Sequence, residues 1–456
     1  MNKTNLFAFF VYLFLSNNSF AQTAAVQAGN NVSRITLQKA VDIALKNNVQ
    51  VKQSMVSVQN SELILQQSKN NKLPSVNGYT GLSTNFGRGI DFLTNTYTNQ
   101  TISNNNLGIN TDLVIYQGGL LQNTIKKNEL DLKATEQDLL AMKNNTALNV
   151  VLAYLNILNF EDQLTIAQSQ SDITKQQIDR TEKLVRAGSL PQSNVFDLKA
   201  QLANEETTIV NSQSNLDIAK LNLIQLMNDP NTTTIELDRI SITAPTSEAY
   251  GSTATQVYNA AEDTQPAILA SDFRTQSTIY NMKMAEAGFK PSLSFSAGAG
   301  SGYSSSGKDI ITREKLRYFT QLNRNLSENV GLNLNIPIFN KFRNKTSLAQ
   351  ANLQKINAEL TAQNARLTLR QNIEQAYVNM NNAAKRFDAL TVQVTALEES
   401  FRAADSRYNA GAIDFVSYNL QKTNLDKAKA NQVQAKYDYV FRTKILDFYQ
   451  NKPLTF

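Results

Sequence analysis

The sequence contains no cysteine, no histidine and no tryptophan among its 456 residues. Without cysteine, it can form no disulfide, carry no lipid-modified N-terminal cysteine and perform no thiol chemistry. Without histidine and cysteine, the usual metal ligands and nucleophile–base pairs are missing. Adjacent carboxylates such as Glu205-Glu206 point to different helix faces and form no acid–base dyad. We therefore expect neither an enzyme nor a cofactor-binding protein.

Long apolar runs and strong charge bias are also absent. No segment after the N-terminal region reaches the roughly 18 consecutive apolar residues of a membrane-spanning helix. The 44 lysines and arginines only slightly outnumber the 38 aspartates and glutamates. No basic cluster with interleaved aromatic residues accompanies this small excess, so we do not expect a nucleic-acid partner.

Glycine and proline are missing from one long stretch, Leu120 to Ala187, although the chain holds 17 glycines and 8 prolines. Its apolar residues recur at intervals of three and four, as in Val150, Tyr154 and Ile157. Gly188 ends the stretch in the manner of a helix C-terminus. The pattern predicts one helix about 100 Å long, which no compact domain accommodates.

The same stretch occurs twice, at a constant offset of 223 residues. Gly108-Ile109-Asn110 matches Gly331-Leu332-Asn333, and the stretch from Ile338 to Ala410 again lacks glycine and proline. The other matches are Ile115-Tyr116 with Ile338-Phe339, Ala153-Tyr154 with Ala376-Tyr377, Ala187-Gly188 with Ala410-Gly411, and Lys199 and Leu202 with Lys422 and Leu425. The chain is therefore an internal duplication of strand, very long helix, tight turn and returning helix.

The N-terminus has the features of a secretory signal. Lys3 precedes an apolar run from Leu6 to Leu15, and Ser19-Phe20-Ala21 is a small-x-small cleavage site. A transmembrane anchor is the alternative, but this run is too short to span a bilayer. We expect residues 1–21 to be a signal peptide and the mature chain to leave the cytoplasm.

Two pairs of segments alternate apolar and polar residues with period two, which predicts strands near 74–86 and 106–117 and near 291–300 and 329–339. Their polar face is almost entirely Asn, Ser and Gly, and strands of about ten residues suit a membrane barrel. A soluble two-faced sheet is the alternative. Four strands cannot close a barrel, which takes about eight, so two or three chains must share one.

The expected domain order follows from these elements. The full division is a signal peptide (1–21), a linker (22–34), a first repeat (35–227, with long helix 119–187 and return helix 191–227), an inter-repeat equatorial region forming a belt around the rods (228–252), a second repeat (253–450, with long helix 341–410 and return helix 415–450) and a tail (451–456). The fold class is mainly α, with long antiparallel helices and a small β-barrel contribution.

This order of elements resembles the TolC family of outer-membrane channel-tunnel proteins over about residues 35 to 450. The resemblance implies a homotrimer with a shared twelve-stranded barrel in outer-membrane lipid and an α-helical tunnel across the periplasm. It also implies the exit duct of a tripartite efflux pump or type I secretion system, docked to a periplasmic adaptor (membrane fusion) protein and an inner-membrane pump. The alternative is a periplasmic or surface coiled-coil structural or adaptor protein, against which the four alternating strands count.

The resemblance points to the turns after the two long helices as the functional end. The residues that match the family's adaptor-contact tips are Arg186, Gly188, Ser189, Leu190, Asn409, Gly411, Ala412 and Ile413. As a structural alternative, both glycines are plain helix C-caps.

The family's tunnel entrance is held by polar and acidic side chains just beyond these turns. Tyr408 matches the family's gate tyrosine, and Asn194 stands where the family has a carboxylate. The positions of its aspartate ring are Ser417 and Leu420 here, so that ring is absent. The nearby acids Asp197 and Asp414 are further entrance candidates, with a solvated helix face as the alternative for each.

Overall fold

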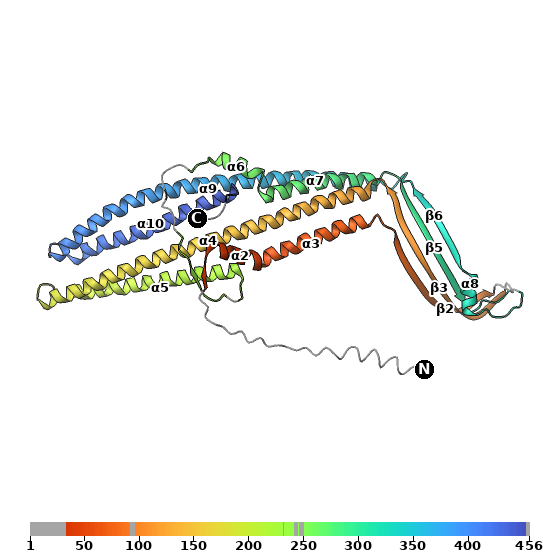
Figure 1. Cartoon of the computed structure of the whole chain (residues 1–456), viewed down its shortest axis with the longest axis horizontal. Helices are drawn as coiled ribbons and strands as arrows, with labels where there is room; N and C mark the ends of the chain where they lie inside the picture. The colour runs from red at the N-terminus through yellow and green to blue at the C-terminus, as the bar shows by residue number, and fades with distance from the viewer. Residues whose placement is uncertain are drawn as a thin grey trace, which may run out of the picture.

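The computed structural model describes residues 33–452, except 92–95, 231, 241–244, 246–249 and 310. The expected signal peptide, most of the linker and the last four residues lie outside the described residues. The molecule is elongated, with two helical hairpins at one end and a sheet at the other (Figure 1). Within the described residues, no helix combines the length and apolar character needed to cross a membrane.

Two very long helices dominate the structure. Helix α4 (Leu120–Arg186) and helix α9 (Arg343–Asn409) have 67 residues each, about 100 Å at 1.5 Å per residue. Each turns back into a helix of 35 residues, α5 (Ser193–Met227) or α10 (Phe415–Tyr449). We call α4 with α5 the first hairpin, and α9 with α10 the second hairpin. Their equal lengths agree with the internal duplication, and the mainly helical fold class is confirmed.

Two shorter helices complete the rods on the side nearer the sheet. Helix α3 (Val49–Asn70) lies along α4, and α7 (Pro266–Ala287) packs against both α4 and α9. Both have 22 residues, so this part is duplicated too. Figure 1 shows that these helices continue the line of α5 and α10 toward the sheet.

The sheet joins the two repeats edge to edge. Its antiparallel order is β2 (Ser75–Asp91), β3 (Thr96–Gln117), β5 (Ser292–Ser304) and β6 (Ser327–Asn335). The register keeps apolar residues together on one face, where Leu113 faces Phe295 and Phe295 faces Leu332. The other face pairs Asn110 with Gly298 and is rich in Asn, Ser and Gly. The predicted alternation therefore produces one apolar and one polar face.

The strands differ from the prediction at both ends of the sheet. The sequence predicted strands only near 74–86 and 106–117, but β2 and β3 continue as a paired ribbon well into the range between them. Its side chains are mostly polar and carry no alternating pattern, yet antiparallel backbone hydrogen bonds need no apolar side chains. Strand β6 ends at Asn335, earlier than predicted, just before Pro337, which has no N–H to give to the ladder.

The turn from strand to long helix has the same left-handed backbone in both repeats. In the first it is formed by Gly118 and Gly119, with φ of 62° and 90°. In the second, Lys341 and Phe342 adopt φ of 57° and 60°. Non-glycine residues in this region cost about 1–3 kcal/mol each, so the surrounding structure imposes the turn. The Phe342 ring packs edge-on against Phe339 at 5.6 Å between centroids.

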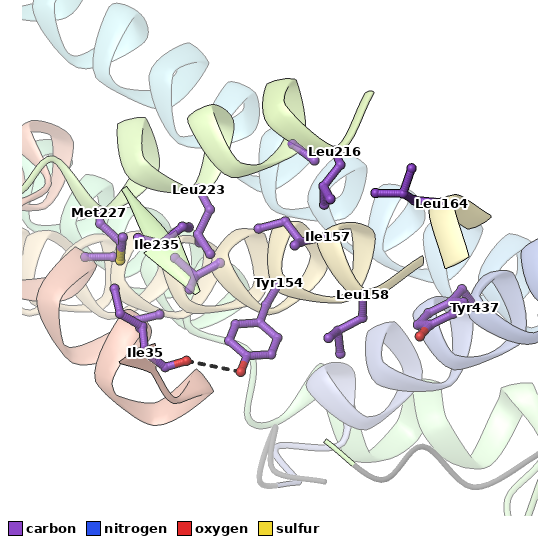
Figure 2. Close-up of a cluster of buried hydrophobic side chains, with 14 residues drawn as sticks. Ile35, Tyr154, Ile157, Leu158, Leu164, Leu216, Leu223, Met227, Ile235 and Tyr437 are labelled. Atoms are coloured by element: carbon purple, nitrogen blue, oxygen red, sulfur yellow. Dashed lines mark hydrogen bonds between the residues drawn. The ribbon is translucent and has the colours of Figure 1, made fainter. Parts of the chain in front are cut away.

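The main core lies midway along α4. Strand β1 (Ser33–Ile35) pairs in parallel with β4 (Ile235–Leu237), and helix α2 (Leu37–Asn47) follows β1. Figure 2 shows apolar side chains from these elements, α4 and α5 converging around Tyr154. The Tyr154 hydroxyl donates to the carbonyl oxygen of Asp238 at 2.6 Å, and burial raises its pKa to about 12. This core packs the first hairpin against β1, α2 and β4.

A second cluster of buried apolar side chains holds α9 at the same distance along the rods. Helix α6 (Ala254–Glu262) packs on α9 and α10, and its N-cap Thr253 forms a capping box with Gln256. The guanidinium of Arg366 on α9 donates to Glu262 at 3.1 Å and to both carboxylate oxygens of Asp272 on α7 at 2.8 and 2.9 Å. Helix α6, at the start of the second repeat, therefore lies along the rods. That the inter-repeat region forms a belt around the rods stays a prediction.

Candidate functional site

The two hairpin tips have the same backbone geometry. After α4, the N–H of Gly188 donates to Val185 O and that of Ser189 to Leu184 O, both at 2.9 Å. After α9, Gly411 and Ala412 make the equivalent bonds at 3.0 and 2.8 Å. This pair of bonds is the Schellman motif, which needs a left-handed residue, and both glycines have φ near 70°. The sequence thus sets two tight turns at the ends of the rods farthest from the sheet (Figure 1).

The tip residues are mostly open to solvent. Arg186, Gly188, Ser189, Gly411 and Ala412 are exposed. Leu190, Asn409 and Ile413 are half-buried, so each tip carries one apolar side chain beside its glycine. A Cβ placed on either glycine would touch nothing within 4 Å. Glycine is therefore required at both positions by the left-handed backbone conformation and not by close packing.

Tyr408 brings the second hairpin against the first. Its side chain is buried, and its hydroxyl lies beside Thr181 of α4 and Asn194 of α5 without a hydrogen bond of good geometry. Burial raises the pKa of Tyr408, while Thr181 and Asn194 oppose that rise. The structure thus brings two of the predicted entrance residues together, Tyr408 and Asn194, across the junction of the hairpins.

The other entrance candidates lie on the surface. Asp197 is exposed on α5. Asp414 is the N-cap of α10 and accepts from the N–H of Ser417 at 2.8 Å. Hydrogen bonds from the Ser417 side chain and backbone lower the pKa of Asp414. Asp414 and Ser417 therefore have a clear local role in starting the helix, and their part in an entrance stays a prediction.

Sequence reasoning missed an aromatic cluster behind the second tip. Tyr408 stacks on Tyr418 at 4.7 Å between centroids, and Phe401 and Phe415 lie against these two rings at 5.6 and 6.4 Å. All four rings come from α9 and α10. Their spacing along two antiparallel helices is the only signal that the sequence offered. The cluster makes the second tip rigid, because large rings pack in few arrangements.

A buried ion pair next to this cluster was also missed. Lys422 of α10 donates to Glu205 of α5 at 2.6 Å, with side chains only 4% and 8% exposed. Lys422 also lies 3.3 Å from Asp426, and Gln201 donates to the same Glu205 oxygen at 2.9 Å. Burial raises the pKa of Asp426, and Lys422 opposes that rise. This pair joins the two hairpins at a second point, which lies farther from the tips than Tyr408.

A cleft of about 650 Å³ opens beside this ion pair between the hairpins. Its walls come from α4 on one side and from α9 and α10 on the other, and they mix apolar side chains such as Ile173 and Phe401 with both signs of charge. Among the described residues, no group of three or more His, Cys, Asp or Glu side chains could hold a metal ion. The tips and this cleft therefore offer exposed surfaces and a groove for binding.

Comparison with known proteins gives a consistent result for both repeats. The sequence model of the family described as "Outer membrane efflux protein" matches residues 40–229 and 257–446. Outer membrane protein TolC of Escherichia coli (strain K12) is 24% identical over 301 residues, which cover 64% of this chain and 58% of TolC. The match thus spans less than two thirds of that relative. Outer membrane efflux protein BepC of Brucella suis biovar 1 (strain 1330) is 21% identical and covers 92% of this chain and 86% of BepC.

Solved structures show the same fold at low identity. The outer-membrane channel OprN superposes with a TM-score of 0.77 at 17% identity, covering 92% of this chain and 90% of OprN. The Campylobacter jejuni CmeC outer membrane channel superposes with a TM-score of 0.76 at 19% identity, covering 92% and 87%. Both comparisons include the sheet, the rods and the hairpins, since they cover nearly the whole described chain.

Proposed function

Because the chain belongs to the outer membrane efflux protein family, we propose that it is a passive export duct running from the periplasm through the outer membrane. The observation that carries this proposal is the joining of one apolar-faced sheet to two rods of about 100 Å. Such a molecule has one end fit for lipid and another that lies a rod's length away. The named relatives are channel and efflux proteins rather than enzymes, which agrees with the absence of histidine and cysteine.

The sheet is the proposed membrane end. Its outer strands, β2 and β6, are edges of a four-stranded sheet, and an open edge in lipid leaves backbone groups without partners. Three copies pairing β2 with β6 would give a closed barrel of twelve strands with a polar, water-filled interior. Exposed aromatic residues lie beyond both ends of the sheet, Phe339 and Phe342 near the long helix and Tyr318 and Phe319 in the connection between β5 and β6. Aromatic girdles of this kind mark the two interfaces of membrane barrels.

Trimer formation is tested by cross-linking in native membranes. Cross-linking of the full chain should trap trimers, because only a closed ring satisfies the β2 and β6 edges. Detergent-extracted protein should also change gel mobility on heating, as closed barrels do when they unfold. A monomer in mild detergent would contradict any shared barrel, and a dimer would contradict the twelve-stranded trimer.

The hairpin tips are the proposed docking end, where a periplasmic adaptor and, through it, an inner-membrane pump would engage. Each chain offers two unlike tips, Ser189-Leu190-Pro191 and Ala412-Ile413-Asp414. Half-buried Leu190 and Ile413 supply apolar contacts, and the cleft between the hairpins supplies a groove. The junction of Tyr408 with Asn194 would hold the entrance closed, and it lacks the aspartate ring of the family pattern. Its closure would then depend on aromatic packing and buried polar contacts.

Replacing both tip apolar residues tests this assignment. The double variant Leu190→Asp/Ile413→Asp should abolish export while trimer yield and membrane insertion stay unchanged, because those properties reside at the other end. The matched control is Ala203→Asp/Gln393→Asp, which adds the same charges at exposed positions on the rods. Normal export by the tip variant, or loss of assembly, would exclude the tips as the docking surface.

A further inference from the structure

The connection between β5 and β6, residues 305–326, is a folded unit, which we call the β5–β6 cap. It contains the short helix α8 (Tyr318–Arg324) and a buried glutamine at its centre. The Gln321 amide accepts from Ser304 N at 2.9 Å and donates to Ser304 O and Leu316 O at 3.0 Å. Gly307 leaves room for it, since a Cβ there would lie 2.6 Å from the amide oxygen. The cap therefore has a defined position on the sheet.

The cap is attached to the apolar face and free edge of β5. Strand β6 begins at Ser327, opposite Gly300, and beyond Gly300 the side chain of Asn325 donates to Gly302 O at 2.6 Å in its place. Ser301 donates to Leu322 O at 2.6 Å, and the Tyr318 ring packs 4.9 Å from Tyr303. Ser301 and Tyr303 alternate in register with Phe295 and so point to the apolar face. Helix α8 thus lies over the apolar face at the end of the sheet far from the rods (Figure 1).

The outer surface of the cap combines exposed apolar residues with cations. Phe319 is 80% exposed and Ile311 is 92% exposed. The exposed cations that make no ion pair within the described part of the chain are Lys308, Arg313, Lys315 and Arg317. Asp309 pairs with Arg324 at 2.9 Å, which leaves Glu314 as the other carboxylate of this segment. The cap therefore combines a net positive charge with two exposed apolar side chains.

We propose that the β5–β6 cap docks on the anionic phosphate head groups of the lipid that surrounds the sheet. The inference rests on the proposed function, because it takes the apolar face of the sheet to contact lipid. Aromatic rings with one apolar and one wet side settle at the membrane interface, and clustered Lys and Arg residues bind anionic head groups. A cap facing the lumen would need neither exposed rings nor an attachment on the apolar face. The cap would hold the outer end of each chain at a fixed depth.

The absence of tryptophan allows a direct test. In the full chain, Phe319→Trp introduces a single tryptophan on the cap, and Leu332→Trp introduces one on the apolar face of β6. Each variant is reconstituted in vesicles of phosphatidylglycerol and phosphatidylcholine, or of phosphatidylcholine alone, with brominated lipid as quencher. We expect lipid to quench the fluorescence of the Leu332→Trp variant in both vesicle types. We expect lipid to quench the fluorescence of the Phe319→Trp variant mainly in the anionic vesicles.

Neutralising two cations tests the role of charge. Lys315→Gln/Arg317→Gln in the Phe319→Trp background should lower the docking equilibrium about fivefold per cation, or about 25-fold in total. The matched control is Lys385→Gln/Arg386→Gln, an exposed pair on α9, and it should leave the quenching unchanged.

The two tryptophan variants also separate failure of the inference from failure of the proposed function. Suppose that lipid quenches the Leu332→Trp variant, while the cap tryptophan of Phe319→Trp stays open to aqueous iodide or is shielded from both quenchers by another chain. The inference then fails and the proposed function stands. If lipid does not quench the Leu332→Trp variant, the proposed function fails and the inference with it.

Discussion

The buried pair of Lys422 and Glu205 should control whether the two hairpins stay together. Lys422→Met removes the cation and keeps the length and apolar stem of the side chain. Glu205 then keeps only the Gln201 amide as a donor, and its second carboxylate oxygen has no partner. Asp426 loses the same cation. The variant therefore leaves carboxylates buried and uncompensated between α5 and α10.

The size of this effect follows from the burial of the pair. Breaking a buried ion pair by removing one partner costs about 3–5 kcal/mol. The cost arises only while the hairpins are in contact, because separation returns Glu205 to water. The ratio of joined to separated hairpins should then fall by about two to nearly four orders of magnitude. Restoring neutrality with Lys422→Met/Glu205→Gln should recover most of this loss, since no buried charge remains on α5.

Spin labels at the tips measure the separation. The chain has no native cysteine, so Ser189→Cys and Ala412→Cys label one exposed site on each tip. Labelled chains are assembled with a large excess of unlabelled chain, so that pulsed EPR reports distances within one chain. We expect a short, narrow distance distribution in the parent protein, and a longer and broader one in Lys422→Met.

Lys429→Met is the matched control. Lys429 pairs with Glu398 at 2.8 Å, but both side chains are more than a third exposed and both belong to the second hairpin. Exposed pairs contribute about 0–1 kcal/mol, so the tip distance should not change. An unchanged distribution in Lys422→Met, or an equal shift in Lys429→Met, would refute the role of the buried pair.

Two further predictions concern the sheet and its cap. Leu334→Arg places a charge on the apolar face and should cost about 2–4 kcal/mol at mid-bilayer, whereas Asn333→Arg on the polar face should be better tolerated. Equal assembly of both variants, judged by heat-modifiable gel mobility, would show that the two faces of the sheet are wrongly assigned. Arg324 and the amides of Thr312 and Ile311 lower the pKa of Asp309 to about 2, below its unfolded value, so this contact stabilises the cap above about pH 4 and is lost as the pH falls through about 2. Hydrogen exchange of residues 305–326 in the parent protein should become faster as the pH falls through this range. If the same pH dependence remained in Asp309→Asn, Asp309 would be excluded as its cause.

Much of the architecture could be predicted because it depends on local or repeated features. The gaps in glycine and proline from Leu120 and from Ile338 predicted α4 and α9, and the constant offset predicted their equal lengths. Period-two alternation predicted which residues share a face of the sheet, and the register agrees. The family resemblance is confirmed by the match over both repeats. The shared barrel, the docking role of the tips and the domain boundaries stay predictions.

The tertiary structure alone decided what happens where elements meet. Lys199 and Lys422 occupy the same position in the two repeats, yet Lys199 is exposed and pairs with Glu182, while Lys422 is buried against Glu205. Nothing local distinguishes the two lysines, because burial depends on which helix lies opposite. The β5–β6 cap is a similar case, since Gln321 becomes its centre only when the end of β5 supplies unpaired backbone groups. The periodicity of helices and strands depends on short stretches of sequence, but contacts between the hairpins depend on residues more than two hundred positions apart.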